Sequence, residues 1–312
     1  MNETPWNRWR DRFVVYMHTR NFSEKSINDY RCSITFFFRF LADQGVETLS
    51  QVTRDLIHAY QTHLYYLERK GKKLSFGTQH GRLSVVKTFF RFCAREEYLP
   101  YDPAADIELP KRTKLLPRGI MTTREIRDIL GAPRGDAPLV LRDRAILELL
   151  YSTGIRNAEL RSLTLFDVDC SGGQLRIRYG KGKKERLVPL GDCAQASLER
   201  YLKKGRPHLA CGPSCSFLFV SVHGNPLSSS NLVWIVRKYL KKTRITKDIT
   251  PHCFRHTCAS HMLKGKADLR HIQELLGHAS VQTTQIYTKV ELSNLKEVHR
   301  KCHPREKMGS SS

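Results

Sequence analysis

The sequence predicts a mainly α protein of two domains: an N-terminal four-helix bundle, then a larger helical domain with a small three-stranded antiparallel sheet. Three observations predict this fold class. The 312-residue chain is long enough for two hydrophobic cores. Through the first third of the chain, apolar side chains recur at three- and four-residue steps, as in amphipathic helices. Residues 163–190 break this pattern with two strand-like segments around a glycine-rich turn.

Four helices account for the N-terminal domain, which we expect to span residues 1–107. Ser23 is a good N-cap for the second helix, and Gly45 is typical of its end. An aromatic stripe on that helix is expected to fill the core rather than stack on nucleic-acid bases; it consists of Phe36, Phe37, Phe38 and Phe40. The expected helices cover residues 5–19, 23–45, 53–69 and 75–97.

A proline-rich, basic stretch separates the two domains. Residues 99–119 hold four prolines, which break regular structure, and four interspersed basic residues, whose charges keep the segment solvated. We interpret residues 108–120 as a linker that crosses a phosphate backbone, and residues 121–312 as the second domain. Its helices are expected to resume at Thr122 or Thr123 and then to cover residues 193–204, 228–242, 252–264, 268–276, a short stretch after Ser280, and 292–301.

The charge of the chain indicates a polyanionic partner. Lys and Arg number 53 against 30 Asp and Glu, for a formal net charge of +23. Residues 1–112 hold 18 of the basic and 13 of the acidic residues, which leaves 35 and 17 in the remainder. A merely soluble surface does not need this excess, so nucleic acid is the expected partner.

The cysteines and the chain start indicate a cytoplasmic protein without a metal. No apolar run approaches the roughly 18 residues of a membrane span, and the polar N-terminus is unlike a signal peptide. The nine cysteines are scattered, as expected of reduced thiols. One alternative is a zinc site, but the spacing within the group matches none of the tight ligand patterns; the group is His208, Cys211, Cys215 and His223.

Four short segments carry groups suited to phosphate chemistry. Arg156 stands where a new helix begins, so its guanidinium adds to the positive end of a helix dipole. Spacings of three and four residues place His252, Arg255 and His256 on one helical face. Gly277-His278 follows a predicted helix end, and Tyr287 comes nine residues later.

Together and in this order, these segments resemble the tyrosine recombinase (phage integrase) family, in particular its short two-domain Xer and mobile-element members. The motifs that carry the resemblance are Thr153-Gly154-Ile155-Arg156-x-x-Glu159-Leu160, the Gly180-Lys181-Gly182 turn, the H-x-x-R-H helix at 252–256, Leu275-Leu276-Gly277-His278, and Thr283-Thr284-Gln285-Ile286-Tyr287. The resemblance extends over essentially the whole chain.

The resemblance implies a role for each matching residue. Tyr287 would be the nucleophile and form a 3′-phosphotyrosine, without a metal ion or other cofactor. Fixed cations must meet the charge that grows on phosphorus in the transition state. Arg156 and Arg255 match this role, and Lys181 matches the general acid that protonates the 5′-oxygen. His252 matches the general base or a hydrogen-bond donor in the transition state, and His278 matches a hydrogen-bond donor to the phosphate. Glu159 matches an acidic residue that supports the site, and His256 is expected to contact these residues rather than the phosphate.

The resemblance also implies partners: double-stranded DNA recombination sites, a homotetramer on DNA, and possible accessory DNA-bending proteins or a second recombinase at the nucleoid. The biological role would be integration and excision of mobile DNA or resolution of chromosome dimers. Residues 290–298 carry an apolar stripe that either folds back on its own domain or docks on a neighbouring protomer.

The departures from the family pattern are small. Phe254 stands where leucine is common, and Lys183 and Lys184 crowd Lys181 in its turn. Cys253 and Cys258 lie beside the matching residues and are expected to be packed rather than oxidation-sensitive. Two alternatives stay open here: a type IB topoisomerase, which uses a similar residue set, and a non-catalytic basic DNA-binding protein.

Overall fold

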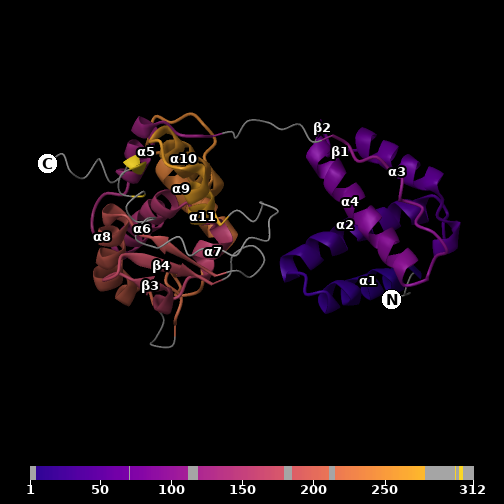
Figure 1. Ribbon diagram of the computed structural model, residues 1–312, viewed down its shortest axis with the longest axis horizontal. Coiled ribbons are helices and arrows are strands. Elements are labelled where there is room, and N and C mark those ends of the chain that lie inside the picture. The colour runs from indigo at the N-terminus through magenta and orange to yellow at the C-terminus, as the bar shows by residue number, and fades with distance from the viewer. Residues whose placement is uncertain are drawn as a thin grey trace. The chain divides into compact units, whose positions relative to one another are not determined.

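The computed structural model describes residues 5–69, 71–111, 119–178, 185–210, 215–277, 299 and 302–304. The chain divides into two compact units, Met1–Leu115 and Leu116–Ser312, each with its own core. Four helices dominate the first unit (Figure 1). They are α1 (Pro5–Thr19), α2 (Glu24–Asp43), α3 (Arg54–Tyr66) and α4 (Phe76–Arg95), with a short hairpin of β1 (Glu68–Arg69) and β2 (Lys72–Lys73).

Aromatic packing holds the first unit together. Phe37 and Phe90 contact each other edge to face with centroids 5.9 Å apart, which joins α2 to α4. Phe37, Phe38 and Phe40 are buried, and Phe36 is partly buried against the same core, so the interpretation of the aromatic stripe as core is confirmed. Ser23 caps α2 as expected, because its side chain accepts a hydrogen bond from the backbone of Ser26.

The third helix ends three residues earlier than the sequence predicts. It ends at Tyr66, and the chain turns into the antiparallel β1–β2 hairpin, in which Arg69 pairs with Lys72. Gly71 has a φ of +70° in this turn, a conformation that glycine adopts without steric cost. Gly71 therefore closes a hairpin and does not simply end a helix.

The second unit is a helical domain around one three-stranded antiparallel sheet. The sheet has the order β3-β4-β5, with Leu175 of β4 opposite Val188 of β5. Its strands are β3 (Val168–Asp169), β4 (Gln174–Ile177) and β5 (Arg186–Pro189). Its helices are α5 (Thr123–Leu130), α6 (Pro138–Thr153), α7 (Asn157–Ser162), α8 (Asp192–Arg200), α9 (Ser229–Leu240), α10 (Pro251–Lys264) and α11 (Leu269–Leu276).

Helix α6 runs through the core of this unit, and most of its residues are buried. It contacts both α8 and α10 (Figure 1). The mainly α fold class, with a small three-stranded antiparallel sheet in the second domain, is thus confirmed. The helices expected after Ser280 and over 292–301 fall almost entirely outside the described residues. Within the described ranges, none of the helices combines the length and apolar character that a membrane crossing requires.

Candidate active site

Arg156 occupies the N-cap position of α7, immediately after the end of α6. Its backbone N–H donates to the Glu159 carboxylate at 3.0 Å, and its Nη1 donates to Glu159 Oε1 at 2.7 Å. The spacing of three residues brings the two side chains onto one side of the helix start. About a quarter of the Arg156 side chain (26%) is exposed, so this arginine is not sealed off from solvent.

Arg255 lies on α10 and is buried. Its Nη1 donates to the carbonyl of Gly154 at 2.8 Å, and its Nη2 donates to the carbonyl of Leu276 at 2.6 Å. Both acceptors terminate helices, where backbone carbonyls lack partners within the helix and the dipole is negative. Burial and the charge of Arg156 lower the pKa of Arg255 to about 10, so it stays protonated at neutral pH.

The end of α11 is where the site converges. Three consecutive carbonyls, those of the last two helical residues 275 and 276 and of the C-cap residue 277, accept hydrogen bonds of 3.3, 2.6 and 2.8 Å from three different side chains. In that order, the donors are Arg186, Arg255 and Arg156. Three cations from β5, α10 and the start of α7 therefore meet at one helix end.

Two glycines make this convergence possible. Gly154 ends α6 with a φ of +59°, and a Cβ there would lie 2.5 Å from the Leu276 side chain. Gly277 ends α11 with a φ of +61°, and a Cβ there would lie 2.9 Å from Nη1 of Arg186. A left-handed turn without a side chain is needed at both positions, because the helix ends and a guanidinium approach so closely.

A single buried carboxylate holds the cations together. Glu159 has a side chain only 2% exposed, and it pairs with both Arg156 and Arg186. Burial alone would raise its pKa, but the hydrogen bonds and charge of Arg186, and the bonds from Arg156, lower it below its ordinary value. With Arg255, three positive charges stand against one negative charge, which suits the site to a phosphate.

Two histidines face each other beside this cluster. Nε2 of His252 lies 3.0 Å from Nε2 of His256, one turn later on α10. Such a pair requires one nitrogen to carry a proton and the other to lack it. Burial, the charge of His256 and the arginines lower the pKa of His252, while burial and Arg255 lower that of His256. Both rings are therefore neutral at neutral pH.

Three predicted residues, Lys181, His278 and Tyr287, lie outside the described residues. The flanking structure still gives their places in the chain. Residues 178–185 connect β4 to β5, which includes Lys181, and His278 directly follows Gly277 at the end of α11. The structure thus brings together Arg156, Glu159, Arg255, His252 and His256, with the segments that carry the other three beginning nearby.

Comparisons with known proteins agree with this geometry. Residues 120–293 match the profile described as Phage integrase family, and residues 11–97 match the one described as Phage integrase, N-terminal SAM-like domain. The tyrosine recombinase XerC 2 of Ralstonia nicotianae is 41% identical over 298 residues, 95% of this chain and 86% of that protein. The tyrosine recombinase XerD of Halalkalibacterium halodurans is 38% identical, covering 92% and 94%. The chain belongs to the phage integrase family.

Solved structures show the same fold. The XerH site-specific recombinase bound to difH substrate, in a pre-cleavage complex, aligns with a TM-score of 0.71 at 18% identity, covering 100% of this chain and 97% of that one. A lambda integrase tetramer bound to a Holliday junction aligns with a TM-score of 0.65 at 20% identity, covering 91% and 80%. The matched profiles and relatives make this chain a site-specific tyrosine recombinase, in preference to a topoisomerase or a passive DNA-binding protein.

Arg186 is the residue of the recombinase's cluster that the sequence did not single out. A strand arginine is ordinarily a surface charge, and the cluster partners of Arg186 are 27 and 89 residues away in sequence. One signal was available. Alternation along the strand places Arg186 on the same face as Val188, which is buried, so its side chain points inward and needs a carboxylate.

The two cysteines of α10 are packed, as expected. Cys258 is completely buried, and burial raises the pKa of its thiol to about 12. Cys253 is buried too, and its Sγ lies 3.4 Å from the backbone nitrogen of Thr250. Because the Cys258 thiol stays protonated and inaccessible, it is a poor target for oxidation.

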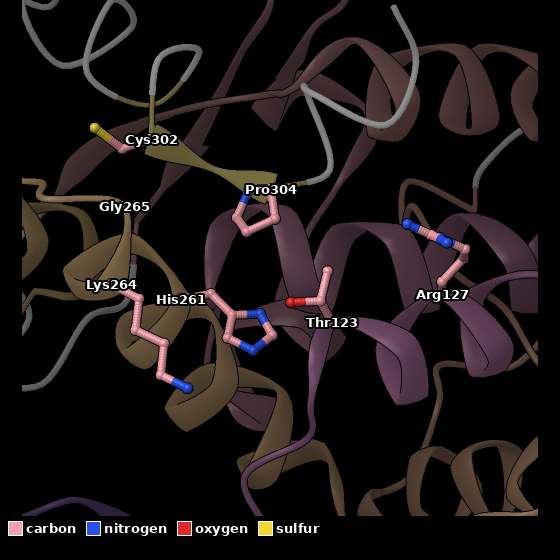
Figure 2. Close-up of a pocket in the computed structure, with 7 residues that line it drawn as sticks. All are labelled: Thr123, Arg127, His261, Lys264, Gly265, Cys302 and Pro304. Carbon is pink, nitrogen blue, oxygen red and sulfur yellow. The ribbon is translucent and has the colours of Figure 1, made fainter. Parts of the chain in front are cut away.

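Elsewhere in this unit, a cavity of about 390 Å³ opens at the other end of α10. Figure 2 shows its lining residues, none of which belongs to the arginine cluster: Thr123, Arg127, His261, Lys264, Gly265, Cys302 and Pro304. Among the described residues, no group of three or more His, Cys, Asp or Glu is placed to hold a metal ion. Cys211, one member of the zinc alternative, lies outside the described residues.

The described part of the C-terminal segment packs on its own domain. His299 and His303 are buried and donate to the carbonyls of Ser152 and Tyr151, at 2.7 and 3.1 Å. These acceptors form the last turn of α6, directly before Gly154 and Arg156. Residues 290–298, whose apolar stripe is expected to pack either on its own domain or on a neighbouring protomer, lie outside the described residues.

Proposed function

We propose that this recombinase cleaves and rejoins DNA with Tyr287 as nucleophile, without a metal ion or external energy source. The observation that carries the proposal is the convergence of Arg156 and Arg255 on adjacent carbonyls at the end of α11. Two guanidiniums with donors beyond those these bonds use can bind two non-bridging oxygens of one phosphodiester. The charge already present there is what a pentavalent phosphorane needs.

The proposed reaction balances within the named residues. The Tyr287 oxygen attacks phosphorus, and its proton passes to the neutral His252. The bond from phosphorus to the 5′-oxygen breaks, and Lys181 protonates the leaving oxygen. His278 donates to a non-bridging oxygen. The 3′-phosphotyrosine keeps the energy of the broken bond until a 5′-hydroxyl from another duplex attacks, which reverses each proton transfer.

We further propose that the active form is a homotetramer on two DNA recombination sites, as the lambda integrase tetramer on a Holliday junction exemplifies. The role would be integration and excision of mobile DNA or resolution of chromosome dimers, at the nucleoid in the cytoplasm. Accessory DNA-bending proteins or a second recombinase would help to select the DNA recombination sites.

The proposal is tested with a suicide substrate, a DNA site nicked near the cleavage point so that the short 5′-product diffuses away. We expect a covalent protein–DNA adduct on the 3′ side, formed at the same rate in excess chelator as in Mg²⁺. Arg156 and Arg255, together with Lys181, supply the charge that a metal would provide. No adduct, or a loss of about ten-fold or more in chelator with DNA binding intact, would contradict it.

The histidine pair predicts a particular pH dependence. Only neutral His252 can accept the phenol proton, so the rate of adduct formation should fall as pH drops through a pKa below 6.5. His256→Asn removes a neighbour that lowers this pKa, so the fall should move to higher pH. Single-turnover rates measured from acidic to mildly alkaline pH test this. His208→Gln, an exposed histidine of the same unit, is the control; an unmoved profile in His256→Asn contradicts the prediction.

A further inference from the structure

Arg186 is bound into the site as tightly as the two arginines of the family pattern. Nη1 and Nη2 of Arg186 donate to the two oxygens of Glu159 at 3.0 and 2.7 Å, a bidentate pair. Nε donates to the carbonyl of Leu275 at 3.3 Å. Its side chain is only 13% exposed. A surface arginine does not make three such hydrogen bonds, so we expect the Arg186 side chain to have a specific role in the site.

Its place in the chain connects three parts of the site. Arg186 is the first residue of β5 and pairs with Ile177 of β4, so it closes the segment that contains Lys181. Its guanidinium reaches both the start of α7, through Glu159, and the end of α11, beside Gly277. The segments that carry Arg156, Lys181 and His278 therefore all border on this one side chain.

The charge of Arg186 decides what Arg156 can do. Glu159 is buried, and a buried carboxylate must be neutralised by its neighbours. With Arg186 in place, one guanidinium pairs both carboxylate oxygens, so the charge of Arg156, which also bonds Oε1, is not cancelled by Glu159. Without Arg186, Glu159 and Arg156 would neutralise each other, and Arg255 would be the remaining unmatched cation among the described cluster residues.

We propose that Arg186 is a positioning residue for strand cleavage. It neutralises Glu159 and fixes the end of α11, which leaves the Arg156 guanidinium available to the phosphate and holds the start of the segment leading to His278 and Tyr287. Arg186 acts through Arg156 and Glu159 and need not touch DNA. This inference rests on the proposed function, because it concerns the same strand cleavage.

The test is a double-mutant cycle of Arg186→Met and Glu159→Gln, read as the single-turnover rate of adduct formation at saturating suicide substrate. Arg186→Met should lose about 100-fold or more in this rate, with the Kd for one-site DNA within about three-fold of wild type. Adding Glu159→Gln should recover about ten-fold, because the carboxylate that captured Arg156 is gone. If Arg186 had a purely structural role, Glu159→Gln would lower the rate of adduct formation further.

Two further variants keep the test decisive. Arg186→Lys retains the charge and one hydrogen bond, so it should recover at least about ten-fold over Arg186→Met even if the latter is poorly folded. Arg206→Met removes another partly buried arginine, one that donates to the carbonyls of Cys215 and Phe217; it should lower thermal stability without slowing cleavage.

Each outcome has one meaning. No adduct from the wild-type protein contradicts the proposed function itself. An active wild type with an Arg186→Met rate within about three-fold of it overturns the positioning role. So does a Glu159→Gln/Arg186→Met protein whose loss equals or exceeds the product of the two single losses, because the residues then act independently.

Discussion

Tyr287→Phe is expected to abolish covalent adduct formation while DNA affinity stays at the wild-type level. The substitution removes one oxygen atom and leaves the ring, so only the nucleophile is lost. The cations that bind the phosphate, including Arg156 and Arg255, are untouched. We expect a fall of about 10⁴-fold or more, to the limit of detection on a suicide substrate, with an unchanged gel shift on one-site DNA.

The control is another tyrosine of the same domain. The Tyr201 hydroxyl donates to the carbonyl of Leu218 at 3.1 Å, and burial raises the pKa of this phenol to about 12. It is thus unsuited to attack a phosphate. Tyr201→Phe should form adduct at the wild-type rate and lose about 1 kcal/mol of stability with the hydrogen bond. Adduct formation by Tyr287→Phe would show that Tyr287 is not the nucleophile.

Local patterns in the sequence predicted local structure well. The Arg156–Glu159 pair follows from a spacing of three residues at a helix start, and the His252–His256 contact from a spacing of four. In each case the interacting groups lie within one turn of helix, where periodicity fixes which side chains meet.

Long-range convergence was beyond the sequence alone. Arg255 and Gly154 are 101 residues apart, and Arg156 and Gly277 are 121 apart. Local patterns marked the arginines as groups suited to phosphate chemistry, and the family resemblance gave their roles. Neither indicated that helix-end carbonyls would orient them. Arg186 was missed for the same reason, because its partners become visible only when β5 is placed against α7 and α11.

The choice of arginine matters for testing the phosphate contacts. Arg255→Ala would leave the carbonyls of Gly154 and Leu276 without their donor in the interior, at about 1–3 kcal/mol each. A loss of activity could then reflect a loss of folding. Arg156 is more exposed and has fewer buried acceptors, so Arg156→Ala is the cleaner variant, with thermal unfolding measured beside it.

Arg156→Ala and Lys181→Ala should both slow cleavage by at least about 100-fold, equivalent to about 3 kcal/mol, yet for different reasons. Arg156 stabilises charge on the non-bridging oxygens, whereas Lys181 protonates the leaving 5′-oxygen. A bridging 5′-phosphorothiolate replaces that oxygen with sulfur, which leaves as a thiolate without a proton. The modified substrate should therefore restore most of the rate to Lys181→Ala and little to Arg156→Ala.

Lys183→Ala and Lys184→Ala, made in parallel, test whether a neighbouring lysine is the acid instead. Equal rescue of Arg156→Ala, together with no rescue of any lysine variant, would show that these roles are misassigned.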